Sequence, residues 1–219
     1  MIPVPFGRLK LPSTSAHGDF HYQDKWVKLS FLHKGDSRLL SCEWDRFDGG
    51  TSLSCNLELY DEPEDSMVIA TPFQSDRKAF YYNQKINNMK VKGEAAYGDH
   101  LYRFSPEEAV GTLDWGRGVW TYANTWYWGS GSGYVDGKSF GFNIGYGFGD
   151  TSAASENMLF YEGKSHKLES VTFHIPKKGK DFSYMDPWRF TSSDGRFEMT
   201  FKPVLDRKDH TSIGIISSD

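Results

Sequence analysis

The chain has 219 residues, of which 25 are basic and 29 acidic, giving a formal net charge of -4. This length is enough to bury a hydrophobic core without a metal or a cofactor, and we expect neither. A slightly acidic chain without a lysine or arginine run argues against a nucleic-acid partner. No signal peptide begins the chain and no apolar run reaches the roughly 20 residues of a membrane helix, so we expect a cytoplasmic protein without a membrane span.

Residues 27–57 predict three consecutive β-strands. Their apolar side chains recur at every second position: Val27, Leu29, Phe31, Leu40, Cys42, Trp44, Leu53, Cys55 and Leu57. A two-residue turn at Gly35–Asp36 would place Val27 opposite Trp44. A second turn at Asp48–Gly49 would place Leu40 opposite Leu57 and Cys42 opposite Cys55, and a turn at Gly49–Gly50 would also keep this face apolar. We expect the two cysteines to remain thiols.

Three further hairpins follow along the chain. The turn at Gly98–Asp99 would bring Glu94 opposite Arg103, as a surface ion pair. A turn at Glu162–Gly163 follows, and one at Asp194–Gly195 would pair Phe190 with Met199 and Trp188 with Phe201. Helix is expected at most as a turn near Ser105, and this point at 105–112 could separate two halves of one β unit that spans 1–219.

The predicted fold class is therefore all-β, an antiparallel up-and-down meander. Closing into a barrel, or into strongly curved sheets, would cover both its edges and its apolar face, and we favour the barrel. The proline-punctuated start and the apolar end "TSIGIISSD" suggest that the natural domain is longer at both ends. Alternatively, a partner chain or a second copy pairs with the terminal edge strand.

The most unusual stretch is residues 119–129, which we predict to be one strand with a row of rings on one face. Its even positions are Trp120, Tyr122, Asn124, Trp126 and Trp128. At about 3.3 Å per residue this row would be roughly 26 Å long. In the next predicted strand, glycines alternate with aromatic residues from Phe140 to Phe148, so either the indoles or a ligand would lie over the glycines.

Polar residues accompany these rings. They are Asp114, Arg117, Asn124, Asn143, Glu156, Asn157 and His166. An apolar cavity with a few polar groups is typical of a ligand site, although aromatic side chains also fill cores. Asp114 and Arg117 form either a structural ion pair or a catalytic pair.

Four stretches carry a family resemblance: "SMVIATPF", "AFYYNQKIN", "DWGRGVWTYANTWYWGSGSG" and "SENMLFYEGKSHKL". With them the chain resembles the bacterial family called domain of unknown function 2804 over nearly its whole length. The resemblance implies a distant relationship to calycin-type or lipocalin-like β-barrels, which include lipid and isoprenoid binders and carotenoid hydratase-like enzymes. It also implies that relatives extend further at both ends, and it assigns no catalytic residue.

Other motifs predict no site. The "GSGSG" run is followed by a strand, whereas a phosphate loop or a nucleophile elbow needs a helix. His17, Asp19 and His21 could share one strand face, but a solvated face is the better interpretation, and we predict no metal.

Three functional hypotheses remain. The first is the binding of an apolar or amphipathic small molecule, such as a lipid or isoprenoid. The residues that would bind it are Arg117, Trp120, Tyr122, Asn124, Trp126, Trp128, Asn143 and Asn157. The second is a hydratase or isomerase with a buried carboxyl, Asp114 or Glu156, as the general acid. The third is carbohydrate binding by stacking on tryptophan rings.

Overall fold

The computed structural model describes residues 10–74, 76–208, 211–213 and 216–218. The described ranges contain strands and turns but no helix, which confirms the all-β class. They accordingly contain no helix that could cross a membrane. The chain divides into two compact units, residues 1–167 and 168–219, and the predicted division at 105–112 falls inside the first unit.

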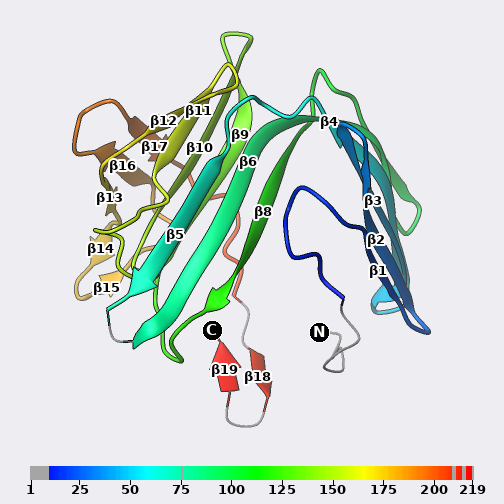
Figure 1. The fold of residues 1–219 in the computed structure, drawn as a ribbon, viewed down its shortest axis with the longest axis horizontal. Helices are drawn as coiled ribbons and strands as arrows, with labels where there is room; N and C mark the ends of the chain where they lie inside the picture. Colours follow the sequence, from blue (N-terminus) through cyan, green and yellow to red (C-terminus); the bar gives the residue numbers. More distant parts are fainter. Residues whose placement is uncertain (1–9, 75, 209–210, 214–215, 219) are drawn as a thin grey trace. The chain divides into compact units, whose positions relative to one another are not determined.

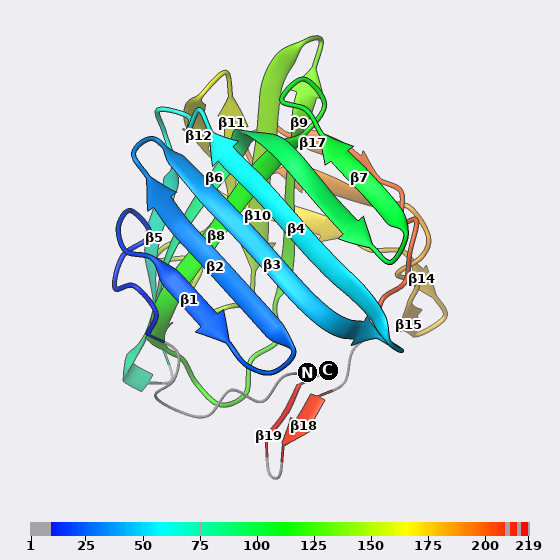
Figure 2. The ribbon, with the colours of Figure 1, turned by 90° about the vertical axis from the view of Figure 1, so that its right-hand side faces the viewer.

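The first unit contains an eight-stranded antiparallel sheet. Its strands are β1 (Phe20–Gln23), β2 (Val27–Lys34), β3 (Ser37–Asp48), β4 (Thr51–Tyr60), β5 (Met67–Phe73), β6 (Asp76–Tyr97), β7 (His100–Phe104) and β8 (Val110–Val119). The order is β1-β2-β3-β4-β6-β5, and β7 and β8 also pair with β6. Figure 2 shows β1 to β4 side by side, and Figure 1 shows the sheet curving between these strands and the group β5, β6 and β8.

The predicted pairings in residues 27–57 are confirmed. Val27 lies opposite Trp44, and Leu40 lies opposite Leu57. The second turn is Gly49–Gly50, and a bulge between Trp44 and Asp48, where Arg46 has a φ of 56°, preserves the register expected for a turn at Asp48–Gly49. An extra residue in one strand can do this because it shifts the alternation locally.

Further local predictions have mixed outcomes. Arg103 lies opposite Glu94 and forms the predicted ion pair at 3.6 Å, while residues 105–109 form a turn closed by two backbone hydrogen bonds to Ser105. The grouping of His17, Asp19 and His21 on one strand face is wrong, because β1 begins only at Phe20 and Asp19 accepts a hydrogen bond from the backbone of His33.

Strand β6 changes the face that it buries. The register between β6 and β8 shifts between Ile86 and Met89, and Asn88 within this bulge has a φ of 63°. Beyond the bulge Met89 and Val91 join Ile86 in one hydrophobic core with Leu59. Odd-numbered residues before the bulge therefore lie on the face of β6 opposite to this core.

A second, four-stranded sheet packs against that other face of β6. Its order is β12 (Lys164–Lys167), β11 (Met158–Tyr161), β10 (Lys138–Tyr146) and β9 (Tyr127–Val135). The Asn87 amide donates to the carbonyl of Gly131 at 3.1 Å and to the Ser132 hydroxyl at 3.0 Å, and Asn88 accepts from the backbone of Gly133. The glycine and serine run thus allows β9 to approach the β6 bulge closely.

The prediction of one continuous strand over residues 119–129 is wrong. Strand β8 ends at Val119 and β9 begins at Tyr127, so that residues 120–126 form a connection. The side chain of Asn124 hydrogen-bonds the hydroxyl and the carbonyl of Thr121, which closes a turn in this connection. The aromatic residues of this stretch contact other aromatic rings and do not line one face of a strand.

The glycines of β10 are also approached differently from either alternative. A Cβ atom at Gly145 would lie 3.1 Å from a carboxylate oxygen of Glu156, and one at Gly141 would lie 3.1 Å from Asn87. Conversely, the Phe142 ring covers Gly131 on the neighbouring strand. Side chains of the protein itself therefore occupy the space beside these glycines.

The second unit contains short strands. They are β13 (Val171–His174), β14 (Lys177–Lys178), β15 (Asp181–Phe182), β16 (Trp188–Ser192), β17 (Glu198–Phe201), β18 (Thr211–Ile213) and β19 (Ile216–Ser218). In the sheet β13-β16-β17, the predicted pairs Phe190–Met199 and Trp188–Phe201 are confirmed. The predicted terminal edge strand is instead two strands, β18 and β19, that pair with each other. None of the described sheets of either unit closes into a barrel.

Candidate functional site

A buried lysine lies between two carboxylates in the first unit. The side chain of Lys85, on β6, is 3% exposed, and its Nζ lies 2.8 Å from Asp114 Oδ2 and 3.2 Å from Glu156 Oε2. Asp114 is the direct partner of Lys85 on β8, and Glu156 lies in the segment between β10 and β11. Burying an ammonium group is unfavourable unless it is paired, so both carboxylates stabilise this position.

Two buried amides hold these carboxylates in place. Asn83 Nδ2 donates to Asp114 Oδ1 at 2.8 Å, and Asn143 Nδ2 donates to the carbonyl and carboxylate oxygens of Glu156 at 2.8 and 3.1 Å. Asn83 Oδ1, in contrast, is buried without a hydrogen-bond partner among the described residues. Leaving a buried acceptor unpaired costs about 1–3 kcal/mol.

Trp128 joins the lysine to one of these amides. Its Nε1 donates to Asn143 Oδ1 at 2.9 Å, and Lys85 Nζ lies 4.4 Å from the centroid of its ring. The second contact is a cation–π interaction. We call Asn83, Lys85, Asp114, Trp128, Asn143 and Glu156 the lysine network.

An aromatic cluster adjoins the lysine network. Its centre is Phe148, whose ring centroid lies 5.4 Å from Phe73, 4.9 Å from Tyr81, 6.0 Å from Trp120 and 5.0 Å from Trp126. Most of these contacts are edge-to-face, the arrangement that aromatic rings prefer. Trp120 and Trp126 are each 51% exposed, so the cluster is open to solvent on at least one side.

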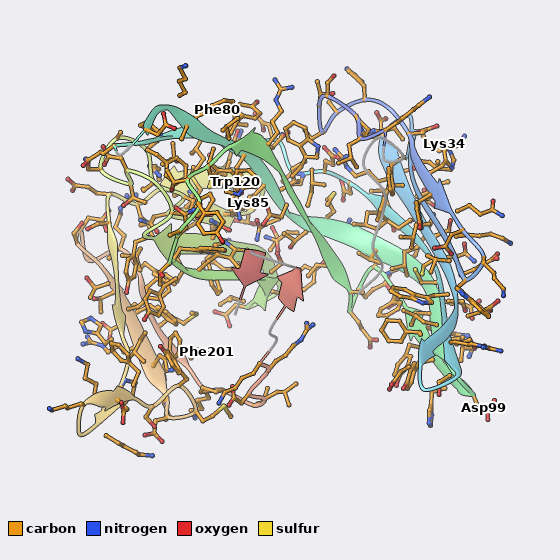
Figure 3. All side chains as sticks on the ribbon, turned by 90° about the horizontal axis from the view of Figure 1, so that it is seen from below. Lys34, Phe80, Lys85, Asp99, Trp120 and Phe201 are labelled. Atoms are coloured by element: carbon orange, nitrogen blue, oxygen red, sulfur yellow. The ribbon has the colours of Figure 1, made fainter. Side chains whose placement is uncertain are left out.

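Tyr81 belongs to both groups. Its ring contacts Trp120 and Phe148, and its hydroxyl accepts a hydrogen bond from Asn83 Nδ2 at 2.5 Å. Burial, together with the charges of Asp114 and Glu156, raises the pKa of Tyr81 well above its ordinary value. The phenol thus stays protonated and can donate a hydrogen bond. Figure 3 labels Lys85 and Trp120, which lie in the same part of the first unit. Trp120 contacts Tyr81, and Tyr81 is linked to Lys85 through Asn83 and Asp114.

Local sequence explains why these side chains fit together. In "DWGRG", Asp114 and Gly116 lie on the same face of β8, opposite Lys85 and Asn83. A Cβ atom at Gly116 would lie 2.9 Å from the Tyr81 ring and 3.0 Å from Asn83 Nδ2. Glycine therefore provides the room in which Tyr81 and Asn83 meet Asp114.

The structure brings six of the predicted site residues together. Asp114, Glu156, Trp128 and Asn143 meet in the lysine network, and Trp120 and Trp126 meet in the aromatic cluster.

The other four predicted residues lie elsewhere or have local roles. The predicted pairing of Asp114 with Arg117 is wrong, because the two lie on opposite faces of β8, and Arg117 donates to the carbonyl of Ser13. Tyr122 is 78% exposed, and Asn124 bonds Thr121. The buried Asn157 accepts from the backbone of Gly145, which is a structural role.

Sequence reasoning missed Tyr81, Asn83 and Lys85. Their signal was the alternation of polar groups in "FYYNQKIN", which is unusual for the centre of a sheet. The alternation alone does not distinguish a solvated face from a buried polar one.

Fold and site define this protein as an all-β protein with a buried lysine network. The chain belongs to the family described as Domain of unknown function (DUF2804), whose model matches residues 1–219, as the sequence motifs predicted. No curated protein matches the chain. No solved structure matches it either. The relationship to calycin-type proteins therefore stays a prediction.

Proposed function

We propose that the first unit binds a small amphipathic molecule where the aromatic cluster adjoins the lysine network. The proposal rests on Tyr81, which belongs to both groups. Its ring packs in the aromatic cluster, and its hydroxyl is hydrogen-bonded in the lysine network. A ligand at this junction would contact rings with its apolar part and hydrogen-bonding groups with its polar part.

The apolar part of the proposal rests on exposed rings. Trp120 and Trp126 are half exposed although they belong to a cluster of five aromatic side chains. Exposed apolar groups that lie together, as distinct from single ones, mark binding surfaces. Tyr122, in the same connection, adds a further exposed ring.

The polar part rests on Asp114. Its side chain is 44% exposed, while Asn83 and Lys85 hold its two oxygens at 2.8 Å each. A carboxylate that is fixed in orientation and still accessible is a suitable acceptor for a ligand, because little conformational entropy is lost on binding.

Two other functions are candidates for the same residues. Carbohydrate binding is favoured by the half-exposed indoles, although their edge-to-face packing leaves less flat surface for a sugar ring. Acid catalysis in a hydratase or isomerase is favoured by Glu156, whose side chain is only 11% exposed, but its carboxylate is bonded to Lys85 and Asn143.

The proposal can be tested with the indole N–H signals of the seven tryptophans in a two-dimensional NMR spectrum. We expect 1-decanol to shift the signals of Trp120, Trp126 and Trp128 and to leave that of Trp26 unchanged. Trp26 is a matched control because it is 39% exposed and lies beside β2, with cationic neighbours instead of an aromatic cluster.

Glucose, added separately, tests the carbohydrate alternative. Shifts of the same indoles by glucose but not by decanol would replace the proposal with sugar binding. If decanol shifts none of the three indoles, or shifts Trp26 equally, the proposal is wrong.

A further inference from the structure

From the chemistry of the lysine network we infer the class of ligand: its polar head is an uncharged hydroxyl group, not a carboxylate, a phosphate or an ammonium. This inference rests on the proposed function and adds the identity of the head group. The inference is based on the polar atoms that a ligand can still reach where the aromatic cluster adjoins the lysine network.

The only cation of the lysine network is not available. Lys85 is 3% exposed, and its ammonium group already contacts Asp114, Glu156 and the ring of Trp128. Lys167 interacts electrostatically with Glu156, but its Nζ is bound to the carbonyl and hydroxyl of Ser155. An anionic head would therefore meet the exposed carboxylate of Asp114 without reaching a free cation, which is unfavourable.

The accessible and unsatisfied atoms of the network are acceptors. Asp114 presents a half-exposed carboxylate, and Asn83 Oδ1 has no partner among the described residues. The acceptor that a ligand can reach is thus the Asp114 carboxylate, which takes a hydrogen-bond donor.

Tyr81 supplies the complementary donor. Because its oxygen accepts from Asn83, its own hydroxyl proton is directed away from that bond. A ligand hydroxyl can donate to Asp114 and accept from Tyr81 at the same time. An ammonium group has no acceptor for the Tyr81 proton and adds a second cation near Lys85.

The test compares three ligands with the same chain length and different heads, namely 1-decanol, decylamine and decanoate, by titration calorimetry at neutral pH. We expect decanol to bind at least about fivefold more tightly than either ion, since each ion loses at least one of the two hydrogen bonds that the hydroxyl can form. Tighter binding of decanoate or decylamine would overturn the inference and leave the proposed function intact. Absence of binding by all three would overturn the proposed function itself.

Two variants test which residues cause the preference for decanol. Tyr81→Phe removes only the hydroxyl and should weaken decanol binding about threefold to tenfold with little change for decylamine. Asp114→Asn should strengthen the binding of decanoate relative to decanol, because it removes the negative charge that repels the carboxylate. The matched control is Glu43→Gln, a change in an exposed carboxylate that pairs with Lys28 on β2.

Should Asp114→Asn fail to fold, Tyr81→Phe still decides the matter. An unchanged decanol affinity in that variant, or an equal loss for all three ligands, would contradict the role of the phenol in selecting a hydroxyl head.

Discussion

Lys85 and Asp114 are direct partners across β6 and β8, and their side chains form an ion pair of 2.8 Å in which the lysine is almost completely buried. Glu156 provides a second carboxylate 3.2 Å from the same nitrogen. One cation therefore stabilises two anions from separate parts of the first unit. The consequences are measurable in stability as well as in binding.

Replacing Lys85 with methionine should lower the free energy of unfolding by about 3–5 kcal/mol, because it leaves the buried Glu156 without its cation. Urea denaturation followed by circular dichroism measures this. The control is Lys28→Met, which removes an equally short but exposed ion pair with Glu43 and should leave stability unchanged. Equal losses in the two variants would contradict the structural importance of the network.

Tyr81 should make the protein sensitive to alkali. Its pKa is raised in the folded state above the ordinary value of 10.0, so the stability that its protonated form contributes is present below that pH and is lost as the pH rises above it. We expect the free energy of unfolding to fall more steeply above pH 10 in the wild type than in Tyr81→Phe. Tyr122→Phe, which changes a phenol that is 78% exposed, should behave like the wild type.

Gly116→Ala should disturb the site from the opposite strand. The added Cβ would lie 2.9 Å from the Tyr81 ring and 3.1 Å from the carbonyl of Tyr82, so the strands must shift, at a cost of about 1–3 kcal/mol. Gly133→Ala is the control, since no atom lies within 4 Å of the added Cβ, and we expect a change within about 0.5 kcal/mol. Thermal unfolding of both variants measures the difference, and a larger loss for Gly133→Ala would refute the packing argument.

The two cysteines should react slowly with thiol reagents. Cys42 and Cys55 lie opposite each other as free thiols on β3 and β4, and burial raises the pKa of both. Because the thiolate is the reactive form, modification by an aromatic disulfide reagent at neutral pH should be much slower in the folded protein than in urea. Equal modification rates in the folded protein and in urea would show that the face of β3 and β4 that carries the two cysteines is accessible to solvent.

Much of the hairpin architecture could be predicted from the sequence. The two-residue turn at Gly35–Asp36 fixes the register of both flanking strands, which is why the pair Val27–Trp44 was correct. The pair Trp188–Phe201 was also correct, because the longer loop between Ser192 and Phe197 is centred on Asp194–Gly195 and keeps the same register. The pairing of β6 with β4 and β8 could not be predicted in this way, because neither pair of strands is joined by one tight turn. The bulge at Asn88 was also missed, since Asn has no obligatory preference for positive φ.

The site was predicted in part. Asp114, Glu156 and three tryptophans were named because charged and aromatic residues in one stretch indicate a site. Lys85 was missed because its partners come from β8 and from the segment after β10, and no local pattern joins them. Arg117 was included by its nearness in sequence, although a spacing of three along a strand places it on the other face from Asp114.

The bulge at Asn88 also determines which residues of β6 face the lysine network and which face the core of Leu59. Lys85 and Met89 are four residues apart and would lie on the same face of a regular strand, yet here they lie on opposite faces of β6. If β6 alternated regularly over all of these residues, the odd-numbered Met89 and Val91 would lie on the same face as Lys85 and would leave the core of Leu59. The extra residue at Asn88 thus lets odd-numbered residues of one strand face two interiors of opposite character.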